Sequence, residues 1–149
     1  MEKNFFVVRV YGIFIDSLHR VLVSDEFRFG MPMTKFPGGG LEYGEGARTC
    51  LERELFEETG LAFNVQDHFY TTDFFVASEF HDQKQLISIY FFVEPVDELP
   101  SGAIDVKGEF RDGVEGSQGF RWIGLNEISE ADFTFPVDKH VANLLKKIL

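Results

Sequence analysis

The sequence of 149 residues is poor in cysteine and has no long apolar run. Its single cysteine, Cys50, cannot form a disulfide within the chain, which is typical of a reducing compartment. No stretch approaches the roughly 18 continuous apolar residues of a membrane-spanning helix. The first residues also lack the layout of a secretory signal peptide. We therefore expect a cytoplasmic protein that neither enters nor crosses a membrane.

Positive charge is also scarce, because 14 Lys and Arg residues face 25 Asp and Glu residues and the formal net charge is −11. Such a surface repels a phosphate backbone, so binding to nucleic acid is disfavoured. A small anionic substrate stays compatible if cations bridge it to the protein. The chain is 44% hydrophobic and 26% charged, an ordinary globular composition. We expect residues 1–149 to form a single domain.

The first third of the chain predicts strands followed by an irregular segment. Residues 5–15 are rich in Val, Ile, Phe and Tyr, which favours a strand. Residues 16–20 have the composition of a turn, and residues 21–24 are expected to return as the partner strand. Residues 25–45 hold five Gly and two Pro, so we expect them to be irregular.

A helix is predicted next, because Ala47, Leu51 and Leu55 recur at the spacing of a helical apolar stripe and Gly60 is a natural end. The remainder predicts more strands, a long loop and a second helix. The expected elements are β-like segments at 63–79 and 85–93 joined by a hairpin at 81–84, a loop at 97–119, a short strand at 120–123 and a helix starting at Pro136.

Glutamate is concentrated between positions 39 and 61, in GGLEYGEGARTCLERELFEETGL. Glu54, Glu57 and Glu58 follow the spacing i, i+3, i+4, so their side chains share one face of the predicted helix. Three clustered carboxylates cost stability unless positive charge lies among them. Arg53 supplies one such charge, and a hard divalent cation such as Mg²⁺ or Mn²⁺, which prefers oxygen ligands, would supply more.

The loop before this helix complements the carboxylates. Residues 36–40 read Phe-Pro-Gly-Gly-Gly, and glycine lets the backbone approach closely and offers its carbonyls to a cation. Glu45 precedes the helix and can reach the same place. A turn and four carboxylates around a cation could bind a diphosphate, neutralise its charge and lower the pKa of a bound water.

The pattern Gly39-x5-Glu45-x7-Arg53-Glu54-Leu55-x-Glu57-Glu58-x-Gly60-Leu61 resembles the Nudix box at every fixed position. Residues 120–128 also resemble the strand and short helix that follow the box in this family. The resemblance implies an α/β fold, the Nudix α/β/α sandwich with a mixed β-sheet and the box as a loop-helix-loop. It further implies Mg²⁺- or Mn²⁺-dependent hydrolysis of a nucleoside diphosphate linked to another moiety.

Carried over by position, the resemblance implies that Glu54, Glu57 and Glu58 are metal ligands, with the Gly38 carbonyl joining them. It implies that Arg53 orients these glutamates through salt bridges. A plainer interpretation of Arg53 is an ordinary i,i+4 pair with Glu57, and both can hold together.

Glu45 is implied to support the site. A carboxylate at the helix N-terminus has a plainer interpretation as a helix-dipole partner. Two sources of the general base stay open. One is Glu54 within the box, and the other is an acid of the 97–119 loop, namely Glu109, Asp112 or Glu115.

Three cations are candidate phosphate contacts: Arg9, Arg28 and Lys35. Arg9 alternates with Val7 and Tyr11 on one face of a predicted strand, where a charge is unexpected unless that face lines a pocket. Most of the 18 Phe residues are expected in the core, among them Phe5, Phe6, Phe14, Phe74, Phe75, Phe91 and Phe92.

The box indicates a reaction class and leaves the substrate open among nucleoside triphosphates, nucleotide sugars and related nucleotides. Residues 76–78, where some family branches carry Pro or Tyr, are Val-Ala-Ser, which disfavours ADP-ribose and dinucleoside polyphosphates. One alternative is a regulatory domain that binds a ligand without turnover. Another is a box-containing isomerase of isoprenoid diphosphates, which Cys50 disfavours because it lies inside the box helix. A homodimer also stays open.

Overall fold

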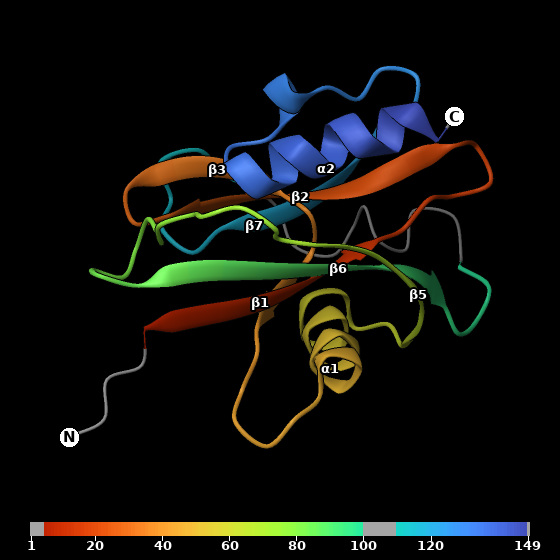
Figure 1. Cartoon of the computed structure of the whole chain (residues 1–149). Helices are drawn as coiled ribbons and strands as arrows, with labels where there is room; N and C mark the ends of the chain where they lie inside the picture. The colour runs from red at the N-terminus through yellow and green to blue at the C-terminus, as the bar shows by residue number, and fades with distance from the viewer. Residues whose placement is uncertain (1–4, 100–109, 149) are drawn as a thin grey trace.

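A computed structural model describes residues 5–99 and 110–148 (Figure 1). The elements follow the order β1 (Phe6–Ile13), β2 (Arg20–Arg28), β3 (Met31–Lys35), β4 (Gly38–Gly40), α1 (Ala47–Thr59), β5 (Phe63–Thr71), β6 (Gln85–Pro95), β7 (Gln118–Gly124), a short 3₁₀ helix (Glu130–Asp132) and α2 (Pro136–Lys147).

The strands form two sheets. A four-stranded mixed sheet has the order β4-β1-β6-β5, in which β1 and β6 are parallel and the other neighbours are antiparallel. A three-stranded antiparallel sheet has the order β3-β2-β7. Helix α1 lies on one side of the strands and α2 on the other (Figure 1). The structure therefore has the α/β fold and the mixed sheet expected from the sequence.

The expected pairing of residues 21–24 with the first strand is wrong. Strand β1 ends at Ile13, and β2 joins the other sheet, where it pairs with β3 and β7. A single bridge between Ile15 and Val21 remains of the expected hairpin. The turn carries the chain from one sheet to the other, and the Asp16 carboxylate holds it by accepting hydrogen bonds from the Leu18 and Arg20 amides.

The expectation that residues 25–45 are irregular is also wrong, because this segment contains the end of β2 and all of β3 and β4. Phe29 and Gly30 both have positive φ, at 55° and 74°, and form a two-residue hairpin turn between β2 and β3. The three glycines of β4 pair with Arg9, Val10 and Tyr11 of β1. Backbone pairing needs no side chain, so a glycine-rich segment can still form a strand.

The two helices begin and end close to the predicted residues. Helix α1 ends at Gly60, which has a left-handed backbone and donates its N–H to the Phe56 carbonyl. Helix α2 starts at Pro136 and carries Lys146 and Lys147 in its last turn, where cations oppose the negative helix end. Within residues 5–99 and 110–148, neither helix is long and apolar enough to span a membrane.

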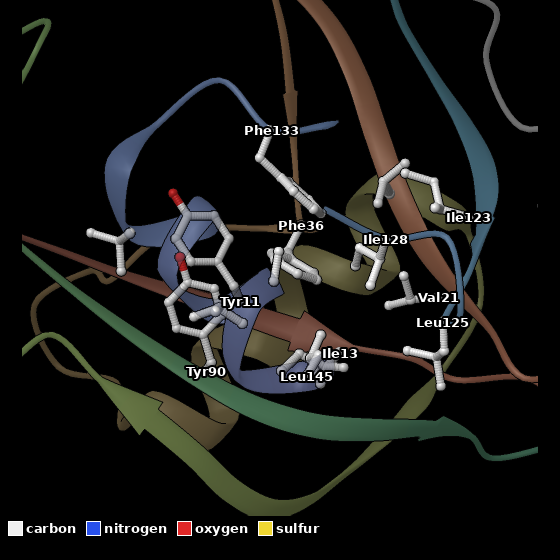
Figure 2. Packing of buried hydrophobic residues seen from close by; sticks show 14 of the residues in the cluster. Tyr11, Ile13, Val21, Phe36, Tyr90, Ile123, Leu125, Ile128, Phe133 and Leu145 are labelled. Carbon is white, nitrogen blue, oxygen red and sulfur yellow. The ribbon is translucent and has the colours of Figure 1, made fainter. Parts of the chain in front are cut away.

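Each helix covers its own part of the core. Under α2, the aromatic rings stack in pairs: Tyr11 on Tyr90 with centroids 5.2 Å apart, and Phe36 on Phe133 with centroids 4.6 Å apart (Figure 2). Under α1, the buried cluster comprises Val10, Phe14, Leu22, Cys50, Leu51, Leu55, Phe63, Phe91, Val93 and Phe120. Both clusters contact β1, so its two faces position both helices.

Core positions are confirmed for Phe14 and Phe91, and Phe92 is half-buried. Four other predictions are wrong, because Phe5, Phe6, Phe74 and Phe75 are exposed. Strand β5 ends at Thr71, not at residue 79, so Phe74 and Phe75 lie in the connection to β6. Alternating residues of a segment are buried only where the segment pairs as a strand. The connection between β5 and β6 is longer than the expected 81–84 hairpin and includes both Phe residues.

The packing of α1 predicts unequal effects for two adjacent substitutions. Leu55 is 1% exposed, whereas Phe56 is 59% exposed. We expect Leu55→Ala to lower the free energy of unfolding by about 2–5 kcal/mol, because it leaves a cavity in the core. Phe56→Ala should change it by about 0.5 kcal/mol or less. Urea denaturation measures both, and equal effects would contradict the assigned face of α1.

Candidate active site

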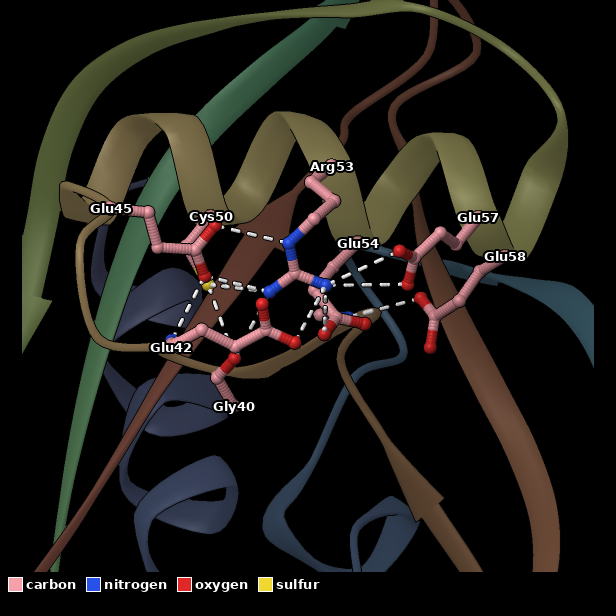
Figure 3. Close-up of polar contacts among 9 residues, drawn as sticks. Gly40, Glu42, Glu45, Cys50, Arg53, Glu54, Glu57 and Glu58 are labelled. Carbon is pink, nitrogen blue, oxygen red and sulfur yellow. Dashed lines mark hydrogen bonds and ion pairs between the residues drawn. The ribbon is translucent and has the colours of Figure 1, made fainter.

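The Arg53 guanidinium lies at the centre of the acidic cluster (Figure 3). Its Nε and Nη2 donate to the two Glu45 carboxylate oxygens at 3.0 and 2.7 Å, which is a bidentate pair. Its Nη1 donates to Glu54 at 3.0 Å and to Glu57 at 3.3 Å, and Nη2 also donates to the Gly40 carbonyl at 3.2 Å. One cation therefore joins the loop, the helix start and two box glutamates.

The Arg53–Glu45 pair stays charged over a wide pH range. Hydrogen bonding from Arg53 lowers the pKa of Glu45 to about 2, and hydrogen bonding to Glu45 is the largest cause that raises the pKa of Arg53. Glu45 reaches the box glutamates through Arg53, and it also accepts a hydrogen bond from the Cys50 thiol of the box helix. The i,i+4 pair of Arg53 with Glu57 is also present, and both interpretations of Arg53 fit the structure.

Gly39 makes room for Glu54. A Cβ atom on Gly39 would lie 2.2 Å from the Glu54 carboxyl carbon, a distance that no real contact allows. A Cβ on Gly38 would lie 2.1 Å from the Val10 carbonyl oxygen. Gly39 therefore lets β4 pass directly beside α1, and Gly38 lets it lie close against β1. By contrast, a Cβ on Gly40 would meet nothing closer than 3.9 Å.

Glu58 points inward, away from Arg53. Its carboxylate accepts hydrogen bonds from the Gly38 amide and from Gln118 Nε2, each at 3.2 Å. Burial and then the neighbouring charge of Glu26 raise the pKa of Glu58 to about 7. Among the residues that the structure describes, no three acidic, His or Cys side chains are grouped closely enough to hold a metal ion.

The box side chains nevertheless suit a hard cation by their chemistry. Glu54, Glu57 and Glu58 offer carboxylate oxygens, the donors that Mg²⁺ and Mn²⁺ prefer, and the Gly38 carbonyl lies on the adjacent loop. The Glu57 side chain is 56% exposed, so it can rotate away from Arg53 without disturbing the core. The residues present therefore fit a divalent cation.

The three cations singled out in the sequence lie together. Arg9, Arg28 and Lys35 come from β1, β2 and β3 and line one cavity of about 170 Å³. Arg9 Nε donates to the Tyr11 hydroxyl at 2.6 Å. The strand face that carries Arg9 thus lines a pocket, which explains why a charged residue lies among the apolar residues of this face.

Polar groups and aromatic rings complete the cavity wall. Asp138 of α2 accepts a hydrogen bond from the Tyr90 hydroxyl at 2.5 Å, and burial raises the pKa of Asp138 to about 7. At another part of the wall, the rings of Phe29 and Phe80 stack with centroids 4.4 Å apart. The wall therefore combines cations, hydrogen-bonding groups and flat apolar surfaces, the usual lining of a ligand site.

Sequence patterns did not identify several of these residues. Glu26, Gln118 and Asp138 are polar side chains drawn into the interior by three different elements. A local signal existed for Glu26, because it alternates with Leu22 and Ser24 and so shares their inward face of β2. Nothing local indicates that Gln118 faces it from β7.

Cys50 is a packed thiol. It is fully buried under α1, and its Sγ lies 3.5 Å from the Gly40 carbonyl oxygen. Burial raises the pKa of Cys50 to about 12, so the nucleophilic thiolate is absent at neutral pH. A buried thiol that stays protonated also disfavours the isomerase, whose chemistry needs a reactive cysteine.

The family model described as NUDIX domain matches residues 6–144. A segment of 47 residues is 45% identical to an RNA pyrophosphohydrolase of Dinoroseobacter shibae. That match covers 32% of this chain, and it spans only 29% of the length of that relative.

Solved structures share the fold at low sequence identity. A MutT protein from Methanosarcina mazei has a TM-score of 0.70 at 16% identity, covering 99% of this chain and 98% of that one. A NUDIX hydrolase from Nitrosomonas europaea has a TM-score of 0.66 at 17% identity, covering 95% and 88%. A MutT NUDIX hydrolase from Burkholderia pseudomallei has a TM-score of 0.66 at 14% identity, covering 98% and 100%.

Because Gly39 lies directly against Glu54, adding a methyl group at position 39 should weaken metal binding, whereas adding one at position 40 should not. We expect Gly39→Ala to displace Glu54 and to weaken Mn²⁺ binding by about tenfold or more, as loss of a supporting contact does at metal sites. Gly40→Ala is the matched control, because its Cβ has room. Titration followed by electron paramagnetic resonance measures both affinities, and equal affinities in two folded variants would contradict the role of this contact.

Proposed function

The chain belongs to the NUDIX domain family of hydrolases, and on that basis we propose that it is a pyrophosphohydrolase dependent on Mg²⁺ or Mn²⁺. Its proposed substrate is a nucleoside diphosphate linked to another moiety. The reaction is hydrolysis of the pyrophosphate bond by attack of water at phosphorus.

The observation that carries this proposal is that the acidic box lies next to a cavity lined by cations. The box contributes carboxylates, and the cavity wall contributes Arg9, Arg28 and Lys35 against the carboxyls of Glu79 and Asp138. With its pKa raised to about 7, Asp138 is only partly ionised at neutral pH. Three cations therefore meet at this cavity in a chain whose net charge is −11, and such cations are what recognition of a phosphate requires.

Each group has a role in this proposal. Glu54, Glu57, Glu58 and the Gly38 carbonyl would hold the metal ion. When bound, that ion supplies positive charge to the phosphate oxygens and lowers the pKa of water. Arg53 fixes the Glu54 carboxylate while Glu45 fixes Arg53. The oxygen of the attacking water bonds to phosphorus, the bridging P–O bond breaks, and the departing phosphate keeps the electron pair. A carboxylate accepts the proton of the water.

Glu54 is the better supported general base. It lies inside the cluster, held by Arg53 beside Gly39. In the competing loop, Asp112 is exposed, and Glu115 accepts a hydrogen bond from the Gly30 amide at 3.3 Å, at the β2–β3 turn. Glu109 lies outside the described residues. The contacts of Glu115 place it at the hairpin turn and not at the box, which favours Glu54.

The cavity suits part of a nucleotide. Its volume of about 170 Å³ is below that of typical small-molecule sites, so it fits one moiety while the pyrophosphate reaches the box. The stacked Phe29 and Phe80 rings offer a flat surface to a nucleobase. The relative that matches one segment is an RNA pyrophosphohydrolase, but the net charge of −11 of this chain opposes binding of a long polyanion. A free nucleotide derivative is therefore the proposed substrate.

A panel of nucleoside triphosphates, nucleotide sugars and other diphosphate derivatives tests the proposal with Mg²⁺ and with Mn²⁺. We expect hydrolysis of at least one compound, and its loss with chelator. Glu57→Gln and Glu58→Gln should each lower kcat by about 100-fold or more, because each removes charge that balances the metal. Glu52→Gln is the matched control, an exposed glutamate of the same helix, and should keep wild-type kcat.

The outcomes separate the alternatives. A compound that binds tightly but is never hydrolysed would favour the regulatory domain without turnover. Rearrangement of an isoprenoid diphosphate without release of phosphate would favour the isomerase. Absence of both binding and hydrolysis across the panel would overturn the proposal.

The source of the general base has its own test. We expect Glu54→Gln to reduce kcat by about 100-fold or more, whereas Asp112→Ala and Glu115→Ala retain it within about threefold. Rates measured at saturating substrate and metal distinguish these variants. A large loss of kcat in Asp112→Ala or Glu115→Ala, with Glu54→Gln active, would move the base to the loop. Glu109→Ala extends the same comparison to the third acid.

A further inference from the structure

Glu26 is a buried carboxylate between the box and the cavity. It is 3% exposed and belongs neither to the box nor to the cavity wall. Its Oε2 accepts hydrogen bonds from Ser24 Oγ at 3.0 Å and from Gln118 Nε2 at 3.4 Å. Lys35 Nζ lies 3.3 Å from the same oxygen, and Arg28 Nε lies 3.6 Å from Oε1.

Strand register explains why these groups meet. In the three-stranded sheet, Ser24 is paired with Lys35, and Glu26 is paired with Gln118. Residues two apart in a strand share a face, so Ser24, Glu26 and Arg28 present their side chains on the same side of β2. The cluster is held by paired strands on both sides of β2, which gives Glu26 a fixed place relative to β3 and β7.

A buried carboxylate needs a neighbouring cation to balance its charge. Lys35 and Arg28 both lie beside Glu26, and their side chains differ in how freely they can move. The Lys35 side chain is 11% exposed, whereas that of Arg28 is 57% exposed. Lys35 has a flexible four-carbon stem and three donors, so its direction depends on what holds it. The Glu26 carboxylate lies within salt-bridge distance of Lys35 Nζ and faces it from the neighbouring strand. Lys35 is thereby directed along the cavity wall.

The same cluster reaches the box. Gln118 Nε2 is 3.2 Å from Glu58 Oε1 and 2.9 Å from Ser24 Oγ, so one side-chain amide lies between the box glutamate and the Glu26 cluster. The charge of Glu26 also raises the pKa of Glu58, after burial itself. Gln118 keeps its contacts with Ser24 and Glu58 when the charge of Glu26 is removed, so the effect of that change is expected at Lys35 and the cavity.

We propose that Glu26 is a positioning residue that holds Lys35 in the direction needed to bind the substrate pyrophosphate. This inference rests on the proposed function. Glu26 touches no reacting atom in this scheme and acts through Lys35. By holding Lys35 in place, Glu26 makes Lys35 the main phosphate-binding cation, whereas Arg28 is mostly exposed.

Neutralising Glu26 changes the affinity for phosphate in opposite directions for two different roles of this residue. The direction of the change therefore identifies the role. If Glu26 competed with phosphate for Lys35, its neutralisation would strengthen binding. If Glu26 positions Lys35, neutralisation frees the ammonium group to swing away and binding weakens. Glu26→Gln separates the two effects, because it keeps the size of the side chain and removes the charge.

Two measurements test the role of Glu26. The first is KM and kcat for the best substrate of the panel. The second is the calorimetric affinity for methylenediphosphonate, an unhydrolysed pyrophosphate mimic, with Mg²⁺ present. For Glu26→Gln we expect KM to rise and affinity to fall about tenfold, with kcat within about threefold of wild type. Glu26→Asp keeps the charge but shortens its reach, so a smaller change in the same direction is expected.

Asp25→Asn is the matched control. Asp25 is the neighbouring carboxylate of β2, paired with Arg121 at 2.6 Å on the opposite face of the strand. Asp25→Asn weakens this ion pair and changes the acceptor of the Thr34 hydroxyl, which donates to Asp25 at 2.6 Å, but Asp25 has no contact with Lys35, so the KM of this variant should match wild type. Circular dichroism confirms folding of each variant, and Glu26→Asp carries the test if Glu26→Gln does not fold.

A double-mutant cycle with Lys35→Met decides whether Glu26 acts through Lys35. In the Lys35→Met background, we expect Glu26→Gln to change KM by less than about twofold, because the group that it positions is gone. A full tenfold rise in that background would overturn the inference in favour of general structural support. Unchanged or improved affinity in Glu26→Gln would also overturn it. Wild type that neither hydrolyses nor binds would instead refute the proposed function.

Discussion

The site depends on one cation placed among acids. Arg53 contacts Glu45, Glu54, Glu57 and the Gly40 carbonyl, so loop and helix share a single guanidinium. Its rigid planar fork matches the two oxygens of Glu45, which a lysine could not do with one ammonium group. Without this charge the carboxylates on α1 would repel one another, and the glycine loop would lose one of its attachments to the helix. The box is therefore an electrostatic unit as much as a ligand set.

The sequence predicted the features that depend on residues close together in the chain. Helix α1 and its end at Gly60 follow from apolar spacing and one glycine, and the acids around Arg53 follow from helical geometry. Strand β4 could not be predicted this way, because three successive glycines become a strand only through pairing with β1. The assignment of β2 to a second sheet is likewise a property of the whole fold, as its partner β7 lies almost a hundred positions later.

The same distinction applies to the site. Sequence reasoning named Arg9, Arg28 and Lys35 individually, and the fold explains their meeting, since β1, β2 and β3 bring them to one cavity. It missed Glu26 and Gln118, which are separated by 92 residues and meet across β2 and β7. A lone glutamate in a strand gives no sign of its partners. The polar layer between the sheets thus becomes visible only when strand register is known.

The turn at Phe29 has a consequence for recognition. A bulky residue with positive φ is uncommon, and the conformation costs about 1 kcal/mol or more unless other contacts hold it. Stacking on Phe80 supplies such a contact, so the aromatic surface is already ordered before any ligand arrives. The entropy of arranging that surface is lost during folding and not during association. A preorganised platform of this kind favours rigid, flat ligands over flexible ones of equal size.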